Sequence, residues 1–153
     1  MEIIKVDKEA AHFRDAVKKY WQVWGDEDNY TFYEDCMKHS HETKDGIPSF
    51  YIGTDQGQIV ATFALIRNDL NSRQDLFPWL ACLYVDENYR GSRVGFQLLD
   101  YARRVAGQLG HETLFLTTDL DGYYEKDGWE NIGKAFGVGG GSIKVYAKGT
   151  MLD

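Results

Sequence analysis

One polar turn in this sequence combines two arginines with two glycines, directly before a periodic helix-forming segment. It reads Arg90-Gly91-Ser92-Arg93-Val94-Gly95. A turn of this kind can direct several main-chain N–H groups to one point, at the positive end of the helix dipole. The ligand that suits these donors best is an anion, most often a phosphate. We therefore expect a phosphorylated cofactor at this turn.

The elements on either side of the turn position it between a strand and a helix. Leu80 to Val85 is an apolar strand, and an apolar stripe runs along the helix as far as Gly110, a typical C-cap residue. The next strand, Thr113 to Thr118, follows that helix. We expect these two strands to pair in parallel, because a helical crossover joins them.

The rest of the chain adds helices and hairpins around this unit. A strand over residues 2–6 precedes a helix that Asp7 can cap and Gly25 ends, and Thr31 and Glu34 have capping-box spacing for a second helix. Hairpins are expected over residues 49–67 and 129–147, and a short helical piece over 123–126. This order predicts a single α/β (α+β) domain over residues 1–153. Its sheet is mixed, mostly antiparallel and six- to seven-stranded, with helices on both faces.

Composition limits the classes of protein to which this chain can belong. Its 153 residues are 43% hydrophobic and 27% charged, which is typical of one soluble globular domain, and no apolar run approaches a membrane span. A net charge of −7 disfavours nucleic-acid binding and favours a cationic partner. Cys36 and Cys82 lie in apolar patterns and are expected as buried free thiols of a cytoplasmic protein. Neither they nor the histidines have metal-ligand spacing, so we expect no metal.

The element order and two motifs together resemble the GNAT superfamily of N-acetyltransferases. The cofactor motif of that family is Arg/Gln-x-x-Gly-x-Gly/Ala, and Arg90 and Gly95 match its ends. Arg93 departs from it, since the family usually has glycine there. Downstream, Tyr124-Glu125-Lys126-Asp127-Gly128-Trp129 is similar to the family's Tyr-Glu-Lys-x-Gly-Phe segment. The resemblance covers nearly the whole chain in the right order.

The resemblance implies an acyl-CoA N-acyltransferase fold, binding of acetyl-CoA, and transfer of the acetyl group to an amine by direct attack. Main-chain groups of the turn would hold the pyrophosphate, and those of the strand before it would pair with the pantetheine arm. The implied cofactor-binding residues are Leu83, Tyr84, Val85, Arg90, Gly91, Ser92, Arg93, Val94, Gly95 and Phe96. Tyr124 would face the thioester sulfur.

The proposed chemistry needs a group at the departing thiolate and a route for the proton of the amine. Full proton transfer from Tyr124 would be uphill by ~2 kcal/mol, because a free tyrosine has a pKa of about 10 and a thiol about 8.5. A hydrogen bond that strengthens as charge builds on sulfur describes its role better. The leading base is Asp119, at the end of a strand, and a water chain without a dedicated base is equally compatible. The other candidate bases are Glu34, Asp35, Asp69 and Asp75.

Acidic and aromatic residues indicate the acceptor. The residues expected to bind it are Glu34, Asp35, Asp75 and Trp79. They suit a small cationic amine, such as a polyamine or an aminoglycoside, by charge and cation–π contact. A protein N-terminus or lysine remains an alternative acceptor, and a non-catalytic acyl-CoA-binding module remains an alternative to an enzyme. The sequence leaves open a monomer or a homodimer.

A dinucleotide-binding unit is the strongest rival interpretation, since a strand, a glycine turn and a helix are present. Three features argue against it. The turn has only Gly91 and Gly95 instead of Gly-x-Gly-x-x-Gly, and residues 86–89 separate the strand from Arg90. The chain also has one clear βαβ unit, preceded by antiparallel strands.

Overall fold

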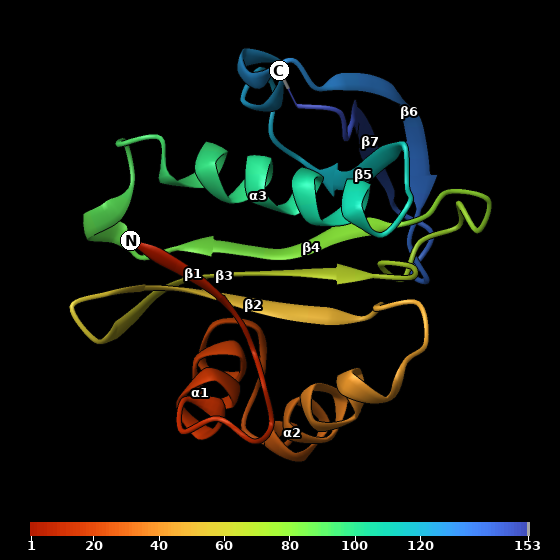
Figure 1. Cartoon of the computed structure of the whole chain (residues 1–153). Coiled ribbons are helices and arrows are strands. Elements are labelled where there is room, and N and C mark those ends of the chain that lie inside the picture. The colour runs from red at the N-terminus through yellow and green to blue at the C-terminus, as the bar shows by residue number, and fades with distance from the viewer. Residues whose placement is uncertain (153) are drawn as a thin grey trace. The chain divides into compact units, whose positions relative to one another are not determined.

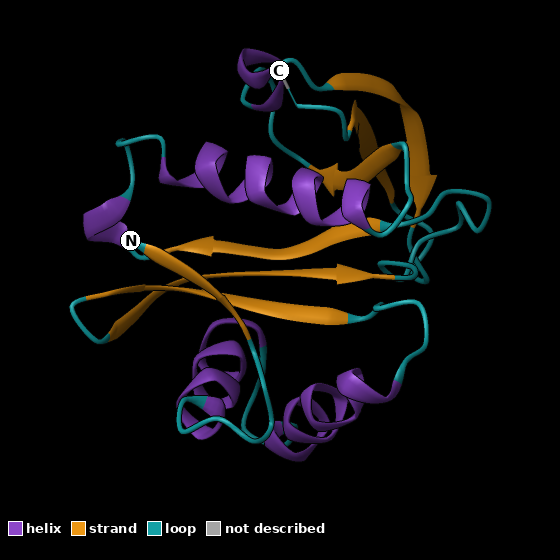
Figure 2. Cartoon of the chain, viewed as in Figure 1, coloured by secondary structure: helices purple, strands orange, loops and turns teal. Residues whose placement is uncertain are grey.

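The computed structural model describes residues 1–152, apart from the side chain of His41. Figure 2 shows the helices, strands and loops of this part of the chain. The strands are β1 (Glu2–Lys5), β2 (Ser49–Asp55), β3 (Gln58–Ile66), β4 (Trp79–Val85), β5 (Thr113–Thr118), β6 (Glu130–Phe136) and β7 (Ser142–Gly149). The helices are α1 (Phe13–Trp24), α2 (Tyr30–His39) and α3 (Val94–Gln108), with short 3-10 segments η1 (Ser40–Glu42), η2 (Glu87–Tyr89) and η3 (Tyr124–Asp127).

The strands form a seven-stranded sheet in the order β1-β2-β3-β4-β5-β7-β6. β1 pairs antiparallel with β2, and β7 pairs antiparallel with both β5 and β6. β4 and β5 are parallel, with Trp79 opposite Phe115. The predicted class, a mixed and mostly antiparallel sheet with helices, is confirmed, and so is the parallel pair around α3.

Contacts within the chain divide it into two compact units. The first comprises Met1–Ala64 and Cys82–Leu98, and the second Leu65–Ala81 and Leu99–Asp153. The turn after β4 belongs to the first unit, and η3 with the end of β5 belongs to the second. A single domain over residues 1–153 stays a prediction.

In the first unit, α1 and α2 lie on one face of β2 and β3 (Figure 1). Tyr20 of α1 is fully buried, and its hydroxyl lies 2.7 Å from the carbonyl oxygen of Tyr51 and 2.5 Å from that of Phe63. The rings of Tyr51 and Phe63 stack at 4.6 Å. This buried tyrosine therefore anchors α1 to two neighbouring strands.

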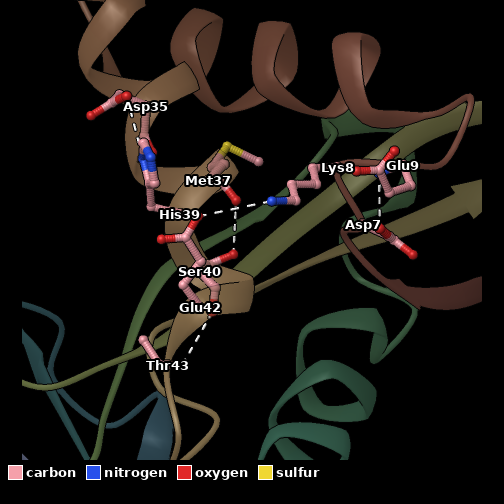
Figure 3. Close-up of polar contacts among 9 residues, drawn as sticks. All are labelled: Asp7, Lys8, Glu9, Asp35, Met37, His39, Ser40, Glu42 and Thr43. Carbon is pink, nitrogen blue, oxygen red and sulfur yellow. Dashed lines mark hydrogen bonds and ion pairs between the residues drawn. The ribbon is translucent and has the colours of Figure 1, made fainter.

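Both helix starts differ from the sequence prediction. His12 is the N-cap of α1, because Asp7 instead uses Oδ1 to accept the main-chain N–H of Glu9 (Figure 3). Asn29 is the N-cap of α2, so Thr31 lies inside the first turn of that helix. At Asp7, the local side-chain bond to the N–H of Glu9 competes with capping of α1.

The end of α2 is secured by polar contacts of the 3-10 segment that follows it. The hydroxyl of Ser40 donates to the carbonyl oxygen of Met37 at 2.8 Å, and Lys8 and Glu42 form an ion pair at 3.9 Å (Figure 3). Met37 is the buried residue of this helix. Its neighbour Cys36 points elsewhere and is exposed, so the expectation of a buried thiol is wrong for Cys36, whereas Cys82 is half-buried.

In the second unit, Trp79 packs with Ala135 of β6 and Val145 of β7, and all three are fully buried. Arg103 of α3 is also buried, and its Nε donates to the carbonyl oxygen of Gly149 at 2.7 Å. This bond ties α3 to the end of β7. Among the described residues, none of the helices has the length and apolarity that crossing a bilayer requires.

Candidate active site

The turn between β4 and α3 presents a set of main-chain donors. Gly91 and Arg93 have positive φ angles of 84° and 64°, and α3 begins at Val94. Within the described chain, the N–H groups of residues 91–95 donate no hydrogen bond to a protein acceptor. Alternating backbone conformations of this kind turn successive N–H groups to one side, and the first turn of a helix leaves its N–H groups unpaired. The turn therefore fits a diphosphate.

The two arginines of the turn are held in different ways. Arg90 donates from Nε to the carbonyl oxygen of Val85 at 2.8 Å. Arg93 adopts the left-handed conformation that favours glycine, with its guanidinium carbon 4.9 Å from the ring centre of Phe96. The departure from the glycine of the family motif thus leaves the backbone of the turn in the conformation that glycine would adopt, and it adds a cation at this position.

Tyr84 of β4 is flanked by two cations. The guanidinium carbon of Arg90 lies 5.6 Å from the ring centre of Tyr84, and Nζ of Lys19 lies 5.5 Å from it. Lys19 also forms an ion pair with Asp86 at 2.8 Å, which joins α1 to the start of the turn. The sequence offered no signal for Lys19, because its position at this site depends on how α1 packs.

β4 has an irregularity at Cys82, whose φ angle is 54°. The hydroxyl of Thr62 donates to the carbonyl oxygen of Cys82 at 2.7 Å, and the indole N–H of Trp24 lies 3.4 Å from that hydroxyl. Residues 79–81 of the strand are buried, whereas residues 82–85 are half-buried. The irregularity thus marks the point in β4 from which the residues, including those predicted to bind pantetheine, are more exposed.

Several polar groups of the first unit lie near Tyr33 of α2. Burial raises the pKa of the Tyr33 hydroxyl, and the nearby thiol of Cys82, the carboxylate of Asp26 and the thiol of Cys36 raise it further. The α1–α2 connection, α2 and β4 therefore contribute polar groups to one region. The sequence gives no signal that Cys82 lies near Tyr33, because β4 and α2 are far apart in the chain.

Tyr124 begins η3 and lies in an aromatic cluster of the second unit. Its ring centre is 4.9 Å from that of Tyr123, 5.9 Å from that of Tyr146 and 6.2 Å from that of Trp129. Burial, with a smaller contribution from Tyr123, raises the pKa of Tyr124 to about 12. The hydroxyl of Tyr124 forms no hydrogen bond with any described residue. This hydroxyl is therefore a protonated donor at neutral pH.

Two carboxylates lie near the end of β5. Asp119 follows the strand directly and is exposed, and its main-chain oxygen accepts a hydrogen bond from Lys144 at 2.9 Å. Asp69 is half-buried and accepts a hydrogen bond from the Thr117 side chain. Burial raises the pKa of Asp69, and the bond from Thr117 offsets part of that rise. The structure thus brings two of the candidate bases to one region of the second unit.

The acidic residues of α2 are exposed. Asp35 lies 3.3 Å from Nδ1 of His39, one helical turn further on (Figure 3). Glu34 is exposed beside it. Both carboxylates are accessible to a solute.

The other two residues expected to contact the acceptor are engaged within the protein. Asp75 forms a two-pronged ion pair with Arg73 at 3.0 and 2.9 Å, and this guanidinium lowers the pKa of the Asp75 carboxyl. Trp79 has no exposed surface, and its indole N–H donates to the carbonyl oxygen of Leu76 at 2.8 Å. Packing accounts for Trp79, because a fully buried side chain offers no surface to a solute.

Comparison with known proteins decides the family. The sequence matches the profile of the acetyltransferase (GNAT) family over residues 10–129, which is most of the chain. The chain belongs to the GNAT family of acetyltransferases. It is thus an acetyl-CoA-dependent N-acetyltransferase. The match spans both motifs, the turn at Arg90–Gly95 and the segment that begins at Tyr124.

Solved structures share the fold of this acetyltransferase. An aminoglycoside 6'-N-acetyltransferase complexed with coenzyme A is 17% identical, with a TM-score of 0.73 over 100% of this chain and 99% of that chain. An aminoglycoside 6'-acetyltransferase type Ii is 21% identical, with a TM-score of 0.73 over the same shares. The aminoglycoside 6'-N-acetyltransferase from Enterococcus faecium is 18% identical, with a TM-score of 0.72, again over 100% and 99%. A comparison with curated proteins found no matching sequence.

Proposed function

We propose that this acetyltransferase transfers the acetyl group of acetyl-CoA to a primary amine of a small cationic acceptor, by direct attack of the amine. The observation that carries the proposal is the row of unpaired main-chain N–H groups over residues 91–95, at the start of α3. A helix start with several free donors is an anion site. In a chain of this family, the corresponding anion is the diphosphate of CoA.

The turn and the end of β4 are proposed to hold the cofactor. Main-chain donors of residues 90–96 bind the diphosphate, and Arg90 and Arg93 add positive charge. The main chain of Leu83, Tyr84 and Val85 pairs with the pantetheine arm, as an added strand would. When bound, acetyl-CoA supplies a thioester carbonyl that an amine can attack.

Tyr124 is proposed to stabilise the charge that develops on the leaving sulfur. With a pKa of about 12, its proton is held more tightly than that of a thiol by about 3.5 pKa units, or ~5 kcal/mol. Complete transfer of the proton is therefore unfavourable. Donation of a hydrogen bond that strengthens as sulfur becomes negative is favourable, and the hydroxyl has no competing partner among the described residues.

The remaining chemistry concerns the amine and the carbonyl oxygen. A main-chain N–H near Val85 is proposed to donate to the carbonyl oxygen. Asp119 is proposed to accept the proton of the incoming ammonium. Its carboxylate is exposed at the end of β5, so a water molecule can carry the proton between the two.

The proposed acceptor is a small cation because the chain is acidic and offers accessible carboxylates. The net charge is −7, and Glu34 and Asp35 of α2 are exposed. An ammonium at Asp75 would have to displace Arg73, so Asp75 is a weaker candidate for binding the acceptor than Glu34 and Asp35. The fold is shared with enzymes named as aminoglycoside acetyltransferases, which adds amino sugars to the acceptors worth testing.

An acetyl-CoA thiol-release screen tests the proposal. The enzyme is offered polyamines, aminoglycosides, neutral amines, amino acids and peptides with a free N-terminus or lysine. Release that depends on a cationic small amine supports the proposal. Faster release with peptides would favour a protein N-terminal or lysine acetyltransferase, and CoA binding without release for any amine would indicate a non-catalytic module.

The proposed setting is the cytoplasm, with the chain acting as a monomer or a homodimer. Cys36 and Cys82 are both free thiols, which suits a reducing compartment. Gel filtration combined with light scattering would separate the two assemblies.

A further inference from the structure

A small pocket in the second unit places Asp69 and Asn71 beside Asp119, the proposed proton acceptor, and the proposed transfer gives these two side chains no role. Its volume is about 320 Å³. Three segments line it: the loop after β3, the end of β5 and the turn between β6 and β7. Its polar lining residues are Asp69, Asn71, Thr117, Asp119 and Ser142.

The loop that carries Asp69 and Asn71 is held in place by hydrogen bonds. Ser72 donates its main-chain N–H to the carbonyl oxygen of Phe136 at 2.9 Å, and the N–H of Phe136 returns a bond to the hydroxyl of Ser72. Asn71 also bridges to Gly137. The loop is therefore fixed against the end of β6, and the pocket is a built feature of this unit.

The charge of the pocket is negative. Asp69 and Asp119 both line it, and among the described residues neither carboxylate forms an ion pair. The nearby cation, Lys144, pairs with the Asp121 carboxylate at 2.9 Å and donates to the main-chain oxygen of Asp119. Partial burial of a carboxylate, as at Asp69, lowers the stability of the folded protein unless a positive charge lies beside it. An ammonium group would supply that charge.

Asn71 adds a second and independent feature, a buried donor without an acceptor. The residue lines the pocket and is only 6% exposed. Its Oδ1 accepts the main-chain N–H of Arg73 at 3.0 Å, which assigns the other amide atom as Nδ2. That Nδ2 has no hydrogen-bond partner in the described chain. Buried donors in folded proteins almost always have partners, so an oxygen acceptor is missing here.

We infer that this pocket binds an ammonium together with a neighbouring oxygen atom of the acceptor, the ammonium at Asp69 and Asp119 and the oxygen at Nδ2 of Asn71. The inference rests on the proposed function and specifies its acceptor. An ammonium cannot accept a hydrogen bond, so a polyamine without oxygen would leave Asn71 unpaired. An amino alcohol or an amino sugar satisfies both groups. The pocket therefore favours an aminoglycoside over a polyamine, two acceptor classes that the negative charge of the chain does not distinguish.

Two matched amines test the inference on the unaltered protein. Oxan-2-ylmethanamine and cyclohexylmethanamine have the same size and the same primary amine, and they differ by one ring oxygen. Calorimetry at pH 7 measures the binding of each to the enzyme saturated with CoA, where both amines are protonated and no transfer occurs. We expect the ring oxygen to tighten binding roughly tenfold, as a bond to a buried donor does. Equal affinities would overturn the inference.

Two variants assign the effect to its residues. Asn71→Asp keeps the oxygen that accepts from Arg73 and removes the donor, so the affinity ratio of the two amines should fall to about one. Asp69→Asn should weaken both amines by roughly tenfold, because a contact between charged groups is lost. Glu112→Gln, an exposed change of the same charge in the same unit, is the control and should bind both amines as the unaltered enzyme does. An unchanged ratio in Asn71→Asp, or Asp69→Asn behaving as the control does, would contradict the inference.

The same proteins keep this inference separate from the proposed function. Thiol release with cationic amines that does not depend on the ring oxygen or on Asp69 would contradict the inferred role of the pocket. The proposed acetyl transfer would still be supported. Oxygen-dependent binding of the two amines without any thiol release would support the pocket and remove the proposed transfer.

Discussion

Arg90 donates a hydrogen bond from Nε to the main-chain oxygen of Val85, over 2.8 Å. This bond joins the first residue of the proposed phosphate turn to the last residue of β4. The guanidinium thereby has two tasks, since it contributes charge to the turn and also holds the end of the strand that is proposed to pair with pantetheine. A family motif predicts the charge, but only the structure reveals the second contact.

Replacement of Arg90 should weaken cofactor binding. Arg90→Ala loses both the charge and the bond to Val85, and we expect CoA affinity to fall by about 1–3 kcal/mol. Arg90→Lys keeps the charge and loses the Nε bond, so its affinity for CoA should lie between that of the unaltered enzyme and that of Arg90→Ala. Isothermal calorimetry with CoA measures both losses. Arg104→Ala, an exposed change on α3, should bind CoA normally, and an equal loss there would show that general charge is responsible.

Replacement of Tyr124 should slow the reaction without loosening the cofactor. Tyr124→Phe keeps the ring contacts with Tyr123, Tyr146 and Trp129 and removes the hydroxyl. We expect turnover to fall at least tenfold, with little change in the affinity for acetyl-CoA. Steady-state kinetics measure both quantities. Tyr123→Phe is the matched control, and unchanged turnover in Tyr124→Phe would remove the proposed role.

The pH dependence of turnover should show no alkaline loss caused by Tyr124. Burial raises its pKa to about 12, so the hydroxyl stays protonated as the pH rises from 8 to about 10.5. Over this range, the profile of the enzyme and that of Tyr124→Phe should have the same shape and differ by a constant factor. A decline near pH 10 that is present in the enzyme and missing in the variant would contradict the raised pKa.

The backbone at Arg93 should prefer glycine over alanine. Its φ angle of 64° costs a residue with a side chain ~1 kcal/mol more than glycine. We therefore expect Arg93→Gly to unfold at higher urea than Arg93→Ala, with a difference of about 1 kcal/mol. At Arg104, inside α3, the order should reverse, because glycine destabilises a helix interior by a similar amount. If the glycine variant were more stable than the alanine variant at both Arg93 and Arg104, backbone conformation could not be the cause of the difference.

Asp69 should reduce stability as the pH rises. Burial raises its pKa in the folded state, so the folded protein binds this proton more tightly than the unfolded chain does. The stability that comes from this tighter proton binding is fully present below the pKa of Asp69 in the unfolded chain, about 3.9. It is lost as the pH rises through the pKa of Asp69 in the folded protein. The unfolding free energy of Asp69→Asn, relative to the original protein, should therefore increase from pH 3.5 to pH 7. Urea unfolding at several pH values measures this difference, and a difference that stays constant with pH, as expected for Glu112→Gln, would contradict it.

The turn and the elements around it could be predicted because their signals are local. The glycines and arginines of residues 90–95, the apolar stripe of α3 and the short strand-forming segment of β5 are each signals of neighbouring residues, and the structure has α3 and β5 at those places. Helix starts were less accurate. Asp7 and Thr31 are residue types that cap helices, but the side chain of Asp7 accepts a nearby N–H, and the N-cap of α2 is Asn29, two residues before Thr31.

The exposure of single side chains was harder to predict. Trp79 has an aromatic ring suited to a cation, yet it is buried in a core cluster with Ala135 of β6 and Val145 of β7. Cys36 lies in an apolar pattern, yet α2 buries Met37 and leaves that thiol exposed. Residue type alone does not say which side of an element meets the core.

By itself, the sequence determined the order of strands and helices, the turn of glycines and arginines after β4 and the family to which the chain belongs. These follow from patterns of neighbouring residues, whose backbone preferences act locally. Only the tertiary structure decided that Thr117 bonds to Asp69, that Asn71 keeps an unpaired donor in the same pocket, and that Lys19 lies against Tyr84. Those relationships join segments far apart in the chain, so they depend on sheet order and packing, which local preferences do not specify.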